Sequence, residues 1–172
     1  MAVGAIYLLT VLVSVFATDA DSISRTDQGP IQCPEPYFRV LSQCFRLYDD
    51  KRRSWEESKA LCYGNGLVLA HPKHPIDVRA AIVERGQKYA WLNARGDGTV
   101  MVWEDTDDYI SNTNALWFHG QPGSRVTADY CLRLLSIEEN MNSTPVQPLL
   151  AYTCSSTKTA AGRGLYALCE LK

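Results

Sequence analysis

The segment Ser54-Trp55-Glu56-Glu57-Ser58-Lys59-Ala60-Leu61-Cys62 predicts a short helix that begins with a defined cap. The Ser54 hydroxyl can accept a hydrogen bond from the Glu57 backbone N–H, and the Glu57 carboxylate can accept one from the Ser54 N–H, which makes a capping box. Trp55, Ser58, Leu61 and Cys62 then share one face. The sequence Gly64-Asn65-Gly66 ends the helix, because both residue types tolerate a positive φ. This helix therefore carries a cysteine on its apolar face.

Six cysteines are spread along the chain, at positions 33, 44, 62, 131, 154 and 169. An even number of cysteines behind a secretion signal is typical of proteins built for an oxidising compartment. Six cysteines allow fifteen pairings, so the sequence alone leaves the pairing open.

The N-terminus predicts such a signal. Residues 2–17 are almost wholly uncharged, and the apolar run is shorter than the about 20 residues that a bilayer-spanning helix needs. Val15 and Ala17 place small residues where a signal peptidase cleaves. We therefore interpret residues 1–17 as a cleaved signal peptide, the alternatives being an uncleaved anchor or a buried helix. We expect residues 18–32 to form a flexible leader, residues 33–172 to form one domain, and the mature protein to be secreted without a membrane span.

Composition agrees with a single globular domain. Hydrophobic residues make up 46% of the chain, which is enough for a core. The 17 Lys and Arg residues balance 19 Asp and Glu residues, for a formal charge of -2. Such a balance offers no electrostatic reason to expect binding to nucleic acid or to an anionic membrane.

The remaining pattern predicts helices early and strands late, which favours an α+β class over an alternating βαβ arrangement. A second helix is expected over Pro75–Arg85. A hairpin is expected over 37–47, and a strong turn signal at 95–98 lies between two strand-like runs. Glu104–Asp129 is expected to be a long loop, and long loops are usually functional. The closing strands are expected over 130–135, 149–152 and 165–170.

Taken together, these pieces resemble the C-type lectin-like domain in its long form. The resemblance covers Cys33 to the C-terminus, and the residues that carry it are Cys33-Pro34, Cys44, Ser54–Ser58, Cys62, Gly66–Ala70, Trp91-Leu92, Val102-Trp103, Trp117–Pro122, Asp129–Cys131, Cys154 and Cys169-Glu170. It implies two helices packed on small antiparallel sheets with a long loop region. It also implies three disulfides: Cys33–Cys44, Cys62–Cys169 and Cys131–Cys154.

The resemblance further implies where a ligand would bind. In sugar-binding members, a calcium ion lies between the long loop and a late strand. Here the loop offers His119, Gln121 and Pro122, and Asp129 lies two residues before a cysteine. Gly123 has no side chain, and Leu149–Ala151 offer no side-chain oxygen, whereas calcium takes six to eight oxygens. We therefore expect no metal cofactor, with calcium possible only through other ligands, and we expect a cis peptide before Pro122.

The function that the resemblance implies is a secreted lectin of the kind that invertebrates use in innate defence. Its partners would be glycans or microbial surfaces, bound without the usual calcium site. The alternative is a module that binds a protein partner through the same long loop and has no sugar activity. Catalysis is not expected, because no nucleophile and base occur together at a known spacing.

Several motifs have two interpretations. Arg95-Gly96-Asp97 is a tripeptide that integrins bind when a loop displays it, but Gly96-Asp97-Gly98 is also ordinary turn chemistry. His71 and His74 lie among prolines, which favours loop histidines over a metal pair. The four tryptophans are expected in the core. Glu104, Asp105, Asp107 and Asp108 are expected to be solvated, the alternative being a peripheral calcium site. Asn142-Ser143-Thr144 is a glycosylation sequon on an apparent insertion.

Overall fold

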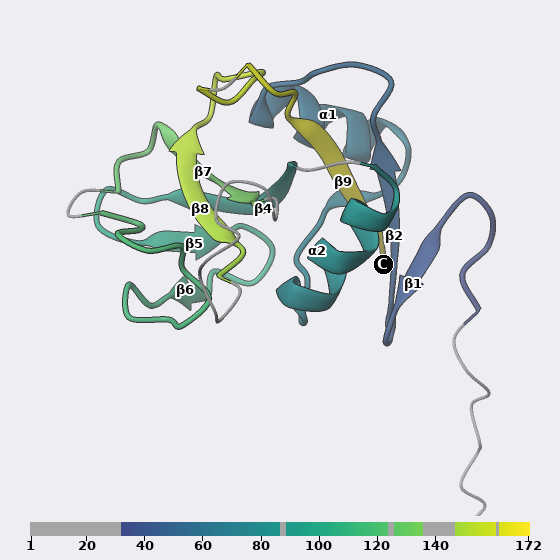
Figure 1. Cartoon of the computed structure of the whole chain (residues 1–172), viewed down its shortest axis with the longest axis horizontal. Coiled ribbons are helices and arrows are strands. Elements are labelled where there is room, and N and C mark those ends of the chain that lie inside the picture. The colour runs from purple at the N-terminus through teal and green to yellow at the C-terminus, as the bar shows by residue number, and fades with distance from the viewer. Residues whose placement is uncertain (1–31, 87–88, 124–125, 136–146, 161) are drawn as a thin grey trace, which may run out of the picture.

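The computed structural model describes residues 32–86, 89–123, 126–135, 147–160 and 162–172. The predicted signal peptide, nearly all of the predicted leader and Asn142 lie outside these residues. The described chain forms, in order, β1 (Phe38–Val40), β2 (Gln43–Tyr48), α1 (Trp55–Gly64), β3 (Val68–Leu69), α2 (Pro75–Glu84), β4 (Ala90–Gly96), β5 (Met101–Trp103), β6 (Tyr109–Ile110), β7 (Tyr130–Leu134), β8 (Leu149–Thr153) and β9 (Tyr166–Leu171) (Figure 1).

The strands join into one mixed sheet rather than into separate antiparallel sheets. Its main path runs β1-β2-β9-β4-β5-β6, with β3 on β9 and the β7–β8 hairpin on β4. Strands β4 and β9 are parallel, with Ala90 opposite Tyr166 and Trp91 opposite Ala167, whereas the other pairs are antiparallel. A parallel pair cannot be closed by a tight turn. Here it is closed by the long chain segment between β4 and β9, which the local pattern does not reveal.

Helix α1 begins as predicted. The Ser54 side chain accepts from Glu57 N, and the Glu57 carboxylate accepts from Ser54 N at 2.8 Å. This hydrogen bond to a backbone N–H holds the pKa of Glu57 below its ordinary value. Trp55 and Cys62 are fully buried, and α1 lies against β9 through the Cys62–Cys169 disulfide. Helix α2 begins at Pro75 and ends one residue before the predicted Arg85, which is its C-cap.

The three disulfides are the pairs that the resemblance implies. Cys33 is bonded to Cys44, Cys62 to Cys169, and Cys131 to Cys154. They brace the N-terminal hairpin, the contact between α1 and β9, and the β7–β8 hairpin. The peptide between Gln121 and Pro122 is cis, as expected.

The tryptophans lie in the core, as predicted. Trp55, Trp91, Trp103 and Trp117 are all at most 8% exposed. A buried indole N–H requires a hydrogen-bond acceptor, and for three of these tryptophans a backbone carbonyl supplies it. Trp55 donates to Leu92 O at 2.8 Å, Trp91 to Arg53 O at 2.9 Å, and Trp117 to Ser111 O at 2.8 Å. The first two bonds fix the start of α1 to β4, and the third lies within the long loop.

Two two-residue strands, β3 and β6, were not predicted, and β4 extends further than expected. Gly96 belongs to β4, so the predicted turn over 95–98 begins only at Asp97. The close approach of another segment of the chain explains why the last residue of β4 is a glycine. A Cβ on Gly96 would lie 2.2 Å from Thr127 O, so the 126–127 segment packs directly on its backbone. None of the described helices is long and apolar enough to cross a membrane.

Candidate functional site

The four residues predicted to contact a ligand do not gather at one place. His119 and Gln121 follow Phe118, whose N–H donates to Leu149 O at the first residue of β8. Asp129 lies beside the other end, because its carbonyl accepts from Cys154 N just after β8. Strand β8 has five residues, so its two ends lie roughly 13 Å apart. His119 is exposed, Gln121 is half-buried and Pro122 is buried.

The usual calcium position offers no oxygen-rich cage. Leu149, Leu150 and Ala151 are at most 8% exposed and form β8 itself. Gly123 has a positive φ and no side chain. Within the part of the chain that the structure describes, no group of three or more His, Cys, Asp or Glu side chains could hold a metal. The described residues therefore do not fit a calcium ion, which takes six to eight oxygens.

The acidic stretch in the long loop is paired rather than solvated, which corrects the sequence interpretation for two of its residues. Glu104 forms an ion pair with Lys59 on α1. Asp105 contacts His71 Nδ1 at 2.9 Å and Lys172 Nζ at 2.5 Å. Its side chain is only 13% exposed. Burial is the largest single influence on Asp105 and opposes its ionisation, but the hydrogen bond from Lys172 and the charges of His71 and Lys172 together outweigh burial and lower the pKa of this carboxyl.

The Arg95-Gly96-Asp97 tripeptide is occupied by structural contacts. Arg95 Nε donates to Ala128 O at 2.7 Å, and its NH1 lies 3.1 Å from Glu56 Oε1. The Asp97 carboxylate accepts from Val100 N, Thr99 N and Thr99 Oγ1, all within 2.9 Å. These hydrogen bonds, above all the one from Val100 N, lower the pKa of Asp97. Arg95 and Gly96 therefore belong to β4, and only Asp97 lies in the turn, where its carboxylate caps the backbone.

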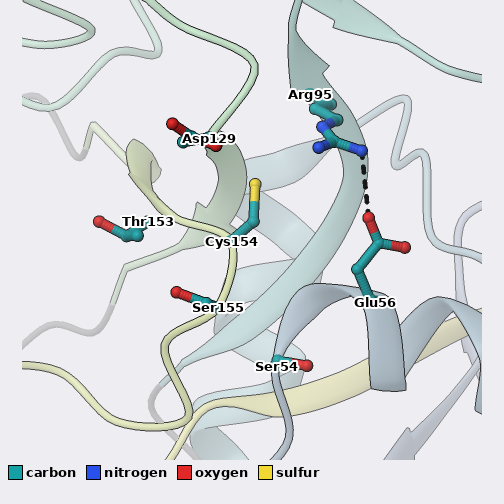
Figure 2. Close-up of a pocket in the computed structure, with 7 residues that line it drawn as sticks. All are labelled: Ser54, Glu56, Arg95, Asp129, Thr153, Cys154 and Ser155. Carbon is teal, nitrogen blue, oxygen red and sulfur yellow. Dashed lines mark hydrogen bonds and ion pairs between the residues drawn. The ribbon is translucent and has the colours of Figure 1, made fainter.

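A pocket with a volume of about 440 Å³ opens between α1, β4 and the β7–β8 hairpin (Figure 2). Its lining consists of Ser54, Glu56, Arg95, Asp129, Thr153, Cys154 and Ser155. Cys154 is bonded to Cys131, which is fully buried, so the disulfide forms the floor. Arg95 pairs with Cys131 across β4 and β7, which sets its side chain beside that floor.

The pocket is lined by one positively charged group, Arg95, and by two negatively charged groups, Glu56 and Asp129. The Arg95 guanidinium is matched by Glu56, as the dashed line in Figure 2 shows. Asp129 is exposed, and no hydrogen bond or ion pair reaches its carboxylate from the described residues. The Thr153 and Ser155 hydroxyls add donors and acceptors at an exposed rim. The arrangement can therefore accept several hydrogen bonds from a ligand that carries donors.

Sequence reasoning identified Asp129 and Arg95 but missed the pocket that joins them. Glu56 was interpreted as part of the helix start, and Thr153 and Ser155 lie next to a cysteine that was interpreted as structural. The β7–β8 register, with Tyr130 opposite Thr153, brings Asp129 beside Thr153 and Ser155, and the β4–β7 pairing with the Arg95–Glu56 ion pair adds the other two residues. No local pattern carries that register, since it depends on the pairing of distant strands.

Comparisons with known proteins agree with this architecture. No protein-family model matches the chain. A curated C-type lectin from Micrurus corallinus is 25% identical over 131 residues, which cover 71% of this chain and 82% of that protein. A calcium-independent type II antifreeze protein superposes with a TM-score of 0.60 at 15% identity, over 84% of this chain and 97% of that one. SPL-1 in complex with GlcNAc superposes with a TM-score of 0.54 at 17% identity, over 81% and 94%.

The described domain thus has the C-type lectin-like fold of the long form, with two helices, a mixed sheet and three disulfides. The solved structures are less than a quarter identical in sequence, so they establish the fold and leave the ligand to be argued from the side chains of this chain.

Proposed function

We propose that this protein is a secreted, non-enzymatic recognition protein that binds carbohydrate on glycans or microbial surfaces without calcium. The observation that carries the proposal is the disulfide-floored pocket, whose lining combines an Asp129 carboxylate that no described residue pairs, the rim hydroxyls of Thr153 and Ser155, and an Arg95 that Glu56 neutralises. His119, Gln121 and Pro122, the other contacts that the sequence predicts, lie at the other end of β8 and do not line this pocket.

The chemistry of the pocket suits a polyhydroxylated ligand. A carboxylate accepts strong, charge-assisted hydrogen bonds from hydroxyl groups. Threonine and serine hydroxyls donate and accept, so they adapt to the ring hydroxyls of a sugar. The Glu56–Arg95 pair sits at the wall and needs no counter-ion from the ligand. Direct contacts of this kind would replace the metal that other members of the fold place between the protein and the sugar hydroxyls.

The relatives support carbohydrate as the ligand class. A curated relative is named a C-type lectin, and SPL-1 has been solved with GlcNAc. The antifreeze protein of the same fold is described as calcium-independent, so the fold tolerates the absence of the metal. Three disulfides support an extracellular location, because such bonds persist in oxidising compartments.

The test is a glycan array probed with calcium and again with a chelator. Retention that is equal in both conditions supports the proposal. Retention that is lost with the chelator contradicts the calcium-independent part. If no glycan is retained under either condition, the proposal is wrong, and recovery of a specific protein partner would favour the protein-binding alternative.

Variants at the two ends of β8 then show which end binds the ligand. Asp129→Asn removes the carboxylate charge from the pocket and should abolish or strongly reduce retention on the array. The double variant His119→Ala and Gln121→Ala changes the other end and should retain binding. Both should melt close to the wild type, because exposed loop substitutions usually cost within about 0.5 kcal/mol. The reverse result would move the site to the long loop around Gln121.

A further inference from the structure

We propose that the binding surface extends from the pocket across the outer face of β4, β5 and β6 to Tyr109, and that it takes a short oligosaccharide without acidic groups. This inference rests on the proposed carbohydrate binding and names its extent and ligand class. It adds Val102 and Tyr109 to the site, neither of which lines the pocket.

The strand register places three side chains in one row. Arg95 lies opposite Val102 in the β4–β5 pair, and Val102 lies opposite Tyr109 in the β5–β6 pair. Residues directly opposite in an antiparallel pair project from the same face of the sheet. Two strand spacings separate Arg95 from Tyr109, which is roughly 10 Å. The pocket and Tyr109 therefore lie at the two ends of one continuous row (β4 to β6 in Figure 1).

This row faces solvent, whereas its neighbours face the core. Arg95 has a side chain that is 37% exposed, and Tyr109 is 76% exposed, the highest value among the exposed large hydrophobic residues that the structure describes. Met101, Trp103 and Ile110, one residue away on the same strands, are all at most 8% exposed. A tyrosine left uncovered next to a polar pocket offers the flat apolar face on which a sugar ring packs.

Tyr109 lies on a hairpin held by backbone hydrogen bonds, so little of the protein would have to become ordered when a ligand contacts this side chain. Trp103 N donates to Asp108 O, and Asp107 N donates to Trp103 O, which closes the turn between β5 and β6. Ile110, the next residue, is anchored in the core. Preorganised contacts lose less conformational entropy on binding than mobile ones.

The charges along the row exclude an acidic ligand. Glu56 neutralises Arg95, and Asp129, which no described residue pairs, adds a negative charge at the pocket end. Asp107 and Asp108 are exposed next to Tyr109 at the other end. A sulfated or sialylated chain would place its charges against these carboxylates, whereas hydroxyl and amine groups would donate to them.

The experiment measures binding of matched sugars by calorimetry in chelator. The probes are the N-acetylglucosamine tetramer, its de-N-acetylated tetramer, a sulfated tetrasaccharide and the N-acetylglucosamine monomer, so that charge and length vary separately. The proposal expects both non-sulfated tetramers to bind and the sulfated one to bind at least about tenfold more weakly.

Tyr109→Ala tests the far end of the row. It should weaken the neutral tetramer about tenfold, which corresponds to about 1.4 kcal/mol, and leave the monomer within about twofold, because one ring fills only the pocket. Tyr63→Ala is the matched control, since Tyr63 is 58% exposed on α1 and lies outside the row, and it should bind every probe as the wild type does.

Three outcomes would overturn the inference. These are unchanged tetramer binding by Tyr109→Ala, tightest binding of the sulfated probe, and no binding of either non-sulfated tetramer by the wild type. The glycan array judges the underlying function separately. A protein that is retained on the array in chelator but fails this series still binds carbohydrate, only not along this row.

Discussion

The imidazole of His71 stacks on the indole of Trp103, with ring centroids 3.8 Å apart and planes 14° from parallel. The same imidazole contacts Asp105, which in turn binds the C-terminal Lys172. This cluster connects the segment after β3, the turn after β5 and the end of β9. It fixes the base of the hairpin that carries Tyr109, so its strength bears on both stability and the proposed binding surface.

Replacing His71 by alanine should destabilise the domain by about 1–2 kcal/mol. The substitution removes a stacked aromatic pair, worth about 0.5–1.5 kcal/mol, and leaves Asp105 with one partner fewer. Urea unfolding measures the change. The matched control is His74→Ala, because His74 is exposed and makes no side-chain cap hydrogen bond, and its cost should stay within about 0.5 kcal/mol. Equal costs for the two variants would contradict the role of the stack.

Stability should fall in acid, partly through Asp105. The folded pKa of Asp105 is lowered, so the charged form stabilises the fold above the unfolded pKa of about 3.9 and this contribution is lost as the pH falls through the folded value. Asp105→Asn should therefore lower stability at neutral pH and flatten the acid limb below about pH 4. Unfolding free energies measured from pH 2 to 7 test this.

Gly96→Ala should cost about 1–3 kcal/mol or more, because its methyl group would lie 2.2 Å from Thr127 O and 2.8 Å from a methyl group of Val126. Thermal unfolding measures the loss. Gly64→Ala in α1 is the control, since no atom lies within 4 Å of the added Cβ, and alanine is the better helix former. That variant should be neutral or slightly more stable. A harmless Gly96→Ala would show that the 126–127 segment does not press on β4.

The disulfides should contribute unequally. Cys62 and Cys169 are 107 residues apart, whereas Cys33 and Cys44 are 11 apart. In the loop-entropy account, the longer loop is worth nearly 5 kcal/mol and the shorter one about 3 kcal/mol. Guanidinium unfolding of the two paired Cys→Ala variants checks the order. A larger loss from removing Cys33–Cys44 would contradict it.

Calcium titration by calorimetry should reveal no site tighter than about millimolar. The late strand supplies only the buried Leu149–Ala151, and Glu104 and Asp105 are already paired with cations. A micromolar site would mean that residues outside the described part of the chain contribute ligands, or that the loop ion pairs open to admit the metal.

The sequence predicted those parts of the fold that local chemistry determines. The capping box needs only Ser54 and Glu57, three residues apart. The disulfide pairs came from the resemblance, since six cysteines alone leave fifteen choices. The two-residue strands β3 and β6 could not be predicted, because they are too short to show an alternating pattern.

The candidate site was harder to predict for a different reason. Asp129 and Gln121 are eight positions apart in the chain, yet they lie beside opposite ends of β8, whereas Glu56 and Arg95 are 39 positions apart and form an ion pair. Lys172 reaches Asp105 across 67 positions. Contacts of this range depend on the register of distant strands, which a single sequence does not display.

The covalent floor of the pocket has a practical consequence for any binding experiment. Asp129 and Thr153 both line the pocket from the β7–β8 hairpin, which the Cys131–Cys154 bond clamps. Protein produced in a reducing cytoplasm, or kept in a thiol-containing buffer, would present an unclamped hairpin. If such material did not bind, the cause could be the reduced disulfide, so the result would not test whether the folded protein binds the sugars.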